Sequence, residues 1–322
     1  MPSLDGLEPL YKKIRKPMSA TFEITSSCNF RCAHCYLGER KADTRTAKVE
    51  EWLELSKILR RMGVVWVEIT GGEPLLYPGL KKLLKFLLNY FMVGLITNLS
   101  LIGERDALLL SKLTYVRGSV YGSAGRLGME VWRSAKKLLS MGANLSVGYQ
   151  ANRENIHEYP RVRQDFKRIG LKLGVNYHYM NTVYNRQAQN QMPSPEQVAK
   201  YISPNLKYEE GKAKRCHIQT TIAVRSDLTF TPCLLFPYNQ GVPLNENKIL
   251  EYYVKEAYVY YEIRELKSPC DGCPYQACRE KHCYAHNITQ AGKPYFKDPF
   301  YCEYYSKLYK IMEERRKLRG TP

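Results

Sequence analysis

The sequence predicts an α/β fold: a partial (β/α)6 barrel of the TIM type followed by a cysteine-rich C-terminal region. Three observations lead to this fold class. Short apolar segments rich in β-branched residues alternate with longer segments of helical periodicity. Six such strands separated by helices favour parallel pairing with right-handed crossovers. The ten cysteines fall into two groups, three before residue 36 and seven from residue 216 onward.

The alternation gives explicit boundaries. The six expected strands span residues 20–25, 64–69, 92–97, 115–121, 144–150 and 171–179. The expected helices between them span residues 46–62, 77–90, 104–113, 130–141 and 155–170. A short helix is expected at 194–202 and a closing amphipathic helix at 303–319. We therefore expect an N-terminal extension (1–17), the barrel (18–205), and a cysteine-rich domain with the closing helix (206–322).

Composition narrows the class of protein. The chain has 322 residues and 44% hydrophobic content, enough for a packed core. The N-terminus lacks a signal-peptide core, and the most apolar run, 83–96, falls short of the roughly 20 residues that span a bilayer. We expect no membrane association and a cytoplasmic location, where clustered cysteines indicate metal binding. The net charge of +18 comes from scattered basic residues without a continuous tract, so we do not expect a nucleic-acid partner.

Three cysteines lie within eight residues, directly after the first expected strand. Cys28, Cys32 and Cys35 have the spacing C-x3-C-x2-C and cannot all pair as disulfides, so a metal centre is the natural interpretation. Structural zinc needs four ligands, and the local fourth candidate, His34, is adjacent to Cys35. Three thiolates on a 4Fe-4S cluster leave one iron without a protein ligand, whereas ferredoxin-type carriers use four cysteines. An open iron can bind a substrate.

This motif resembles the signature of the radical S-adenosylmethionine (SAM) superfamily, with His34 at the family's aromatic position. The segment Gly71-Gly72-Glu73-Pro74, which follows the next expected strand, resembles the family's GGEP motif. The resemblance implies that the open iron chelates SAM, that reductive cleavage gives a 5'-deoxyadenosyl radical, and that the GGEP turn contacts the SAM amino group. It also implies that further polar residues at strand ends line the SAM pocket, although each could simply cap a strand end. These residues are Thr97, Asn98, Ser119 and Gln150.

The later cysteines resemble the SPASM extension of radical SAM enzymes, which carries auxiliary 4Fe-4S clusters. The resemblance implies an outer cluster on Cys270, Cys273, Cys278 and Cys302. It implies an inner cluster on Cys216, Cys233 and Cys283. The spacings within the group 270–283 and Leu228 in place of a usual glycine depart from the SPASM pattern. A zinc module at 270–283 is the alternative, since C-x2-C pairs also occur in zinc ribbons.

Counting ligands gives a further expectation. The SAM cluster and two auxiliary clusters with four thiolates each need one cysteine more than the ten in the chain. The resemblance assigns the missing ligand to the inner cluster, where water, substrate or a nearby side chain would replace it. The nearby side chains are Glu209, Glu210, His217 and Asp227. The count also leaves no free thiol as a hydrogen donor, which favours an oxidative reaction.

The resemblance implies hydrogen abstraction from a peptide or protein, giving an oxidised side chain or a crosslink. The alternatives are tailoring of a small molecule such as a tetrapyrrole, and an iron-sulfur electron-transfer or RNA-binding protein, against which the GGEP motif argues. An electron donor such as ferredoxin or flavodoxin is implied. The 19 residues before the first strand are too few for a leader-peptide-binding domain. We therefore expect a separate leader-binding partner or recognition by residues 181–215, of which 181–195 reads as a linker or substrate-facing loop.

Overall fold

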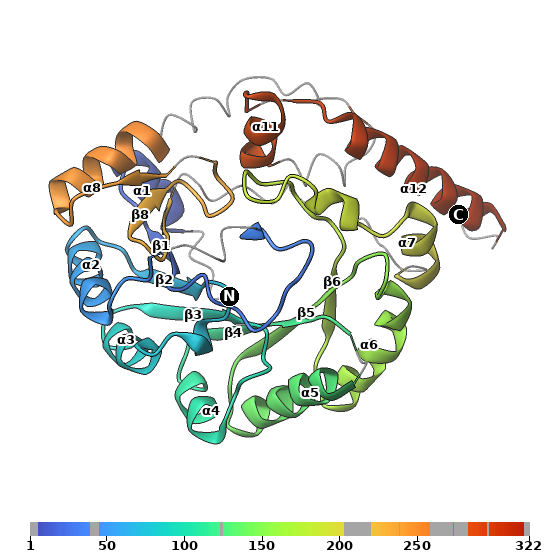
Figure 1. Cartoon of the computed structure of the whole chain (residues 1–322), viewed down its shortest axis with the longest axis horizontal. Coiled ribbons are helices and arrows are strands. Elements are labelled where there is room, and N and C mark those ends of the chain that lie inside the picture. Colours follow the sequence, from blue (N-terminus) through green and yellow to red (C-terminus); the bar gives the residue numbers. More distant parts are fainter. Residues whose placement is uncertain are drawn as a thin grey trace.

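One continuous sheet forms the framework of the molecule (Figure 1). The computed structural model describes residues 6–38, 45–122, 125–202, 220–237, 239–257, 273, 283–294 and 296–318. In this part of the chain the sheet has nine strands in the order β6-β5-β4-β3-β2-β1-β7-β8-β9. Six of them, all parallel, are β1 (Ser19–Glu23), β2 (Trp66–Thr70), β3 (Met92–Thr97), β4 (Tyr115–Val120), β5 (Leu145–Gln150) and β6 (Leu173–Asn176).

Helices connect these strands and cover the outer, convex face of the sheet (Figure 1). They are α2 (Val49–Arg61), α3 (Leu80–Leu87), α4 (Glu104–Leu110), α5 (Gly125–Ser140) and α6 (Tyr159–Arg168), with short turns η2 (Pro74–Leu76) and η3 (Ile156–Glu158). The predicted (β/α)6 alternation is confirmed. Strand β3 has the predicted bounds, and β6 is shorter than predicted because the chain leaves the sheet after Asn176.

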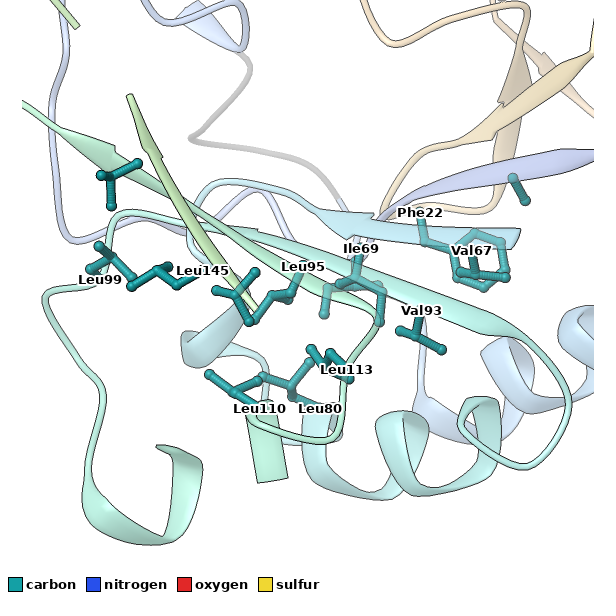
Figure 2. Close-up of a cluster of buried hydrophobic side chains, with 14 of the residues drawn as sticks. Phe22, Val67, Ile69, Leu80, Val93, Leu95, Leu99, Leu110, Leu113 and Leu145 are labelled. Atoms are coloured by element: carbon teal, nitrogen blue, oxygen red, sulfur yellow. The ribbon is translucent and has the colours of Figure 1, made fainter. Parts of the chain in front are cut away.

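The main core lies between the sheet and these helices. Alternate side chains along each strand point to one face, so Val67 and Ile69 of β2 enter the core together with Val93 and Leu95 of β3. Figure 2 shows these strand residues against Leu80, Leu110 and Leu113 on the helical side. The polar residues of the same strands therefore face the inside of the barrel, where the Tyr115 hydroxyl donates to the Glu68 carboxylate.

The C-terminal region extends the barrel sheet. Strand β7 (Thr221–Val224) pairs in parallel with β1, and Ser19 lies opposite Thr221. Strands β8 (Thr229–Thr231) and β9 (Gln240–Gly241) then add in antiparallel order. Strands β7 and β8 form a hairpin directly before Cys233. The sheet continues across the boundary that the sequence suggested near residue 205.

The remaining elements surround this sheet. They are α1 (Glu8–Ile14), η4 (Ala188–Gln191), α7 (Pro195–Tyr201), α8 (Glu246–Tyr252), the π-helical η6 (Tyr253–Ala257), α11 (Tyr284–Ala291) and α12 (Pro299–Leu318). Helix α12 packs on α7 and buries Tyr304, Tyr305 and Leu308, as predicted for the closing helix. Ser194 caps α7 by accepting from the Gln197 amide. Within the described residues, no helix is long and apolar enough to cross a membrane.

Candidate active site

The three cysteines of the C-x3-C-x2-C motif lie on the loop that leaves β1. The Cys35 amide donates to the Cys32 carbonyl at 3.1 Å, and the Phe30 amide donates to Cys28 Sγ at 3.4 Å. All three cysteines are partly exposed. They line a cavity of 310 Å³ at the C-terminal ends of the parallel strands. Ligands of parallel α/β folds bind at this end of the sheet.

Most of the residues singled out from the sequence line the same cavity. Beside the cysteines these are His34, Gly71, Gly72, Thr97, Asn98, Ser119 and Gln150. They come from β1, β2, β3, β4 and β5, or from the loops directly after these strands. The C-terminal ends of the parallel strands meet at one edge of the sheet (the strand-end rule). The fold therefore brings together residues that are more than 100 positions apart in the chain. Glu73 and Pro74 are the two exceptions, because both are buried and neither lines the cavity.

Glu73 turns into the protein and organises the cavity wall. Its carboxylate accepts hydrogen bonds from Thr97 Oγ1 at 2.8 Å, the Asn98 amide at 2.7 Å and the Leu75 amide at 3.2 Å. Burial raises the pKa of Glu73, and these hydrogen bonds counteract part of that rise. The side chain is fully buried. In this structure Glu73 fixes the end of β3, so its expected contact with SAM stays a prediction.

The two glycines of the GGEP turn allow it to pack against the chain entering the cysteine loop. The Gly72 amide donates to the Thr25 carbonyl and the Glu73 amide donates to the Ser27 carbonyl, both at 2.8 Å. A Cβ atom on Gly72 would lie 2.2 Å from the Ser27 oxygen, and one on Gly71 would lie 2.5 Å from the Thr25 oxygen. Any larger residue would therefore push the two loops apart. The sequence motif thus has a structural reason in the chain itself.

Aromatic rings also line the cavity. The His34 ring stacks on Tyr179 with centroids 4.2 Å apart and lies 5.9 Å from Tyr121. Burial, followed by the nearby Cys32, raises the pKa of Tyr121 well above its usual value. Burial and then Glu23 have the same effect on the pKa of Tyr36, whose hydroxyl donates to Glu23 Oε2 at 3.0 Å. These phenols are therefore neutral at physiological pH.

Sequence reasoning missed several cavity residues. They are Phe30, Tyr36, Thr70, Ile96, Tyr121, Asn176, His178, Tyr179, Met180 and Leu235. Asn176 ends β6, so the strand-end rule applied to the sixth strand would have found it. Leu235 had no such signal because it belongs to the C-terminal region. His178 Nδ1 lies 2.8 Å from Tyr305 Oη of α12, which ties the cavity to the closing helix.

The segment after β6 packs directly on the cysteine loop. Asn185 Nδ2 donates to the carbonyls of Ala33 at 2.7 Å and Cys35 at 3.1 Å. Thr182 Oγ1 donates to the Tyr36 carbonyl at 2.9 Å. The sequence left this segment open as a linker or a substrate-facing loop, and the contacts favour a loop that braces the site. Residues 203–215, the last part of the expected recognition region, lie outside the described residues.

Two of the later cysteines come together near the cavity. Cys233 and Cys283 both pack against a small apolar cluster of Phe236, Ala285 and Ile288. Leu235 packs on this cluster and also lines the cavity. Cys216, Cys270 and Cys278 lie outside the described residues, so the expected ligand sets stay predictions. Cys273 and Cys302 are both partly exposed.

The non-cysteine ligand expected for the inner cluster also stays a prediction. Asp227 Oδ1 accepts from the Thr229 hydroxyl at 2.6 Å and the Thr229 amide at 3.0 Å, which stabilises the turn between β7 and β8. Glu209, Glu210 and His217 lie outside the described residues. Asp227 is therefore already engaged in local structure.

The donor chemistry of the site fits a 4Fe-4S cluster with an open iron. Three thiols face one cavity, and polar backbone and side-chain groups from the neighbouring strand ends surround the remaining space. Across the described residues, no three His, Cys, Asp or Glu side chains converge on a point suited to one metal ion. The fit therefore rests on the shared cavity and the thiol donors.

Comparison with known proteins agrees with this geometry. The family model described as "Radical SAM superfamily" matches residues 22–169. The antilisterial bacteriocin subtilosin biosynthesis protein AlbA of Bacillus subtilis (strain 168) is 27% identical over 250 residues, covering 69% of this chain and 56% of AlbA. The sporulation killing factor maturation protein SkfB of the same strain is 28% identical over 166 residues, covering 48% and 40%. The chain spans about half the length of these curated relatives.

Solved structures show the same fold. Native anSMEcpe with bound AdoMet has a TM-score of 0.69 at 16% identity, covering 93% of this chain and 98% of that chain. SuiB of Streptococcus suis bound to precursor peptide SuiA has a TM-score of 0.64 at 17% identity, covering 90% and 78%. Both likenesses extend beyond the barrel into the C-terminal region. Residues 22–169 of the chain are therefore similar to the radical SAM superfamily, and the solved structures share a fold with this chain that includes the C-terminal region.

Proposed function

We propose that this protein is a radical SAM enzyme that abstracts a hydrogen atom from a peptide and leaves it oxidised or crosslinked. One observation carries the proposal: the three motif cysteines share a cavity with the GGEP turn and the polar ends of β3, β4 and β5. Cys28, Cys32 and Cys35 would hold a 4Fe-4S cluster. When bound, the cluster and SAM would supply the radical chemistry, and the protein would orient them.

Different residues of the chain would contact SAM, position the cysteine loop and close the cavity. Thr97, Asn98, Ser119 and Gln150 are the polar strand-end residues that line the cavity and would contact SAM. The Thr97 hydroxyl and the Asn98 side chain are also held by hydrogen bonds to Glu73 and Asn29. Gly71 and Gly72 keep the adjoining backbone close to the cysteine loop. The ring of His34, held against Tyr179, closes the loop side of the cavity. The described residues that line the cavity carry no Asp, Glu, Lys or Arg side chain.

Room for a substrate exists next to this cavity. A second hollow of 640 Å³ shares Phe30, Cys32, His34 and Tyr121 with the first. Glu154, Glu158 and Arg31 also line it, so this hollow offers apolar surface together with charges of both signs. A side chain of a peptide lying here would reach the cysteine loop without displacing the GGEP turn. We propose this hollow as the entry for the substrate.

The peptide substrate is supported by what the relatives do. AlbA is named for subtilosin biosynthesis, SkfB for maturation of the sporulation killing factor, and the PqqA peptide cyclase of Granulibacter bethesdensis, 26% identical over 204 residues, for a peptide. We also propose the two auxiliary clusters on the later cysteines, a ferredoxin or flavodoxin as electron donor, and a separate peptide-binding partner. Iron-sulfur ligands must remain reduced, which favours a cytoplasmic location.

Coexpression tests this function. The protein would be produced with short peptides encoded by neighbouring genes, and their masses compared with those from cells that carry the Cys28→Ala, Cys32→Ala, Cys35→Ala triple variant. We expect one peptide to lose a pair of hydrogen atoms only with the wild-type protein. If no peptide changes while a tetrapyrrole intermediate is consumed, the substrate is a small molecule and the peptide proposal is wrong.

A further inference from the structure

A buried arginine holds the segment that carries Cys233. Arg225 directly follows β7, and its side chain has an exposed fraction of 0%. Its Nη2 donates to the carbonyl oxygens of Leu234 at 3.1 Å and Phe236 at 3.0 Å. These two carbonyls flank Leu235, which lines the cavity. One guanidinium nitrogen therefore fixes the turn that begins at Cys233.

The same guanidinium faces the cysteine loop from the other side. Nη1 of Arg225 lies 3.8 Å from Oε2 of Glu23, whose side chain also has an exposed fraction of 0%. This carboxylate oxygen accepts from the Tyr36 hydroxyl at 3.0 Å. Tyr36 follows Cys35 in the chain. A series of polar contacts through Glu23 and Arg225 thus joins Tyr36, the chain neighbour of Cys35, to Leu234, the chain neighbour of Cys233.

Stability alone does not account for this pair. Removing two charges from water costs several kcal/mol per ion, and well-packed apolar residues at such sites often give equal or greater stability. The geometry is also not ideal for an ion pair, because Nε and Nη1 of Arg225 form no hydrogen bond with the described part of the chain. The two charges instead lie between the segment that follows Cys35 and the segment that follows Cys233.

We propose that Arg225 and Glu23 are positioning residues that join the two cysteine segments and set the reduction potential of the cluster at Cys233. This inference rests on the proposed function, because it requires an auxiliary cluster at Cys233. A fixed positive charge in a low-dielectric interior stabilises the reduced, more negative form of a neighbouring cluster. The carboxylate of Glu23 has the opposite effect. Together they balance the local charge while fixing the geometry.

The two charges make a signed prediction. Arg225→Met removes the positive charge, so the potential of the cluster at Cys233 should fall. Glu23→Gln removes the negative charge and keeps an acceptor for Tyr36, so the same potential should rise. A purely structural role would not shift the reduction potential in opposite directions, since both variants would loosen the same contact.

An EPR-monitored redox titration of the reconstituted full chain measures these shifts. The triple cysteine variant at positions 28, 32 and 35 provides the background, so that the remaining signals come from auxiliary clusters. Cys233→Ala then identifies the signal that depends on Cys233. The matched control is the surface ion pair between Arg61 and Glu246, which also joins the barrel to the C-terminal region. The charged atoms of this pair are 3.3 Å apart, and both side chains are more than one third exposed. Arg61→Met and Glu246→Gln should leave the potential unchanged.

Opposite shifts for Arg225→Met and Glu23→Gln support the inference. Unchanged potentials, or shifts in the same direction, overturn it. If Arg225→Met does not fold, Glu23→Gln decides alone, and an unchanged or lowered potential overturns the inference. A wild-type chain that shows no auxiliary signal would instead refute the auxiliary clusters of the proposed function.

Discussion

Replacing Gly72 by alanine should separate the GGEP turn from the cysteine loop. The new Cβ atom would lie 2.2 Å from the Ser27 carbonyl oxygen and 2.6 Å from that of Ser26. Both are backbone atoms, so no side chain can rotate away. Ordinary van der Waals contact begins at 3.4 Å, so the two loops would have to move apart by about 1 Å.

The expected loss in the free energy of unfolding follows from these contacts. Overpacking of this kind costs about 1–3 kcal/mol. The same movement stretches the hydrogen bonds from Gly72 to Thr25 and from Glu73 to Ser27, both 2.8 Å, and each is worth about 1 kcal/mol. We therefore expect Gly72→Ala to lower the free energy of unfolding by about 2–4 kcal/mol.

Urea unfolding of the cluster-free protein, followed by tryptophan fluorescence, measures this change. A loss of this size corresponds to a fall of about 1 M in the urea midpoint for a chain of this length. Gly241→Ala is the control, because a Cβ atom at Gly241 has nothing within 4 Å. If Gly72→Ala unfolds at the same urea concentration as the wild type and the control, the close approach of the two loops is not what requires glycine.

Three further predictions concern the scaffold and its surface. Trp52 is fully buried, and its ring lies 4.8 Å from the Phe22 ring. Trp52→Ala should lower the free energy of unfolding by about 3–5 kcal/mol in the same urea assay. A loss below about 1 kcal/mol would argue against the place of Trp52 in the core. Lys307 lowers the pKa of Glu196 to about 2, so the pair stabilises the fold above the unfolded pKa near 4.5, and this contribution is lost as pH falls through about 2. Glu196→Gln should therefore lower the melting temperature slightly at pH 7 and not near pH 2, and an equal effect at both pH values would contradict the pairing. Titration with tRNA and duplex DNA at physiological salt should show no submicromolar binding, because the basic residues form no continuous tract; tight binding that weakens steeply with salt would favour an RNA-modifying enzyme.

Hydrophobic periodicity was enough to predict the barrel. The strand at Met92–Thr97 has the predicted bounds because Val93 and Leu95 alternate with inward-facing residues. Rules for helix ends were less reliable. Helix α5 begins at Gly125 rather than near residue 130, and Gly125 and Gly128 weaken the helical signal of its first turn. The pairing of β7 with β1 had no signal at all, because it joins segments about 200 residues apart.

The candidate site was predictable where spacing or strand ends carried the information. The cysteine motif and the strand-end residues Thr97, Ser119 and Gln150 line one cavity. Glu73 could not be placed from the sequence, because its inward orientation depends on hydrogen bonds to β3. Leu235 and Arg225 were also missed, since their relation to the cysteine loop exists only in the folded sheet.

The central claim is that Cys28, Cys32 and Cys35 form the site of SAM cleavage. The direct measurement is the formation of 5'-deoxyadenosine by the anaerobically reconstituted protein with dithionite and SAM, alongside the iron content. We predict product from the wild type with up to about 12 irons per chain, and no product from the triple alanine variant, which should keep the auxiliary share of about eight. A triple variant that still cleaves SAM at the wild-type rate, or a wild type that binds its iron and produces no 5'-deoxyadenosine, would contradict the assignment.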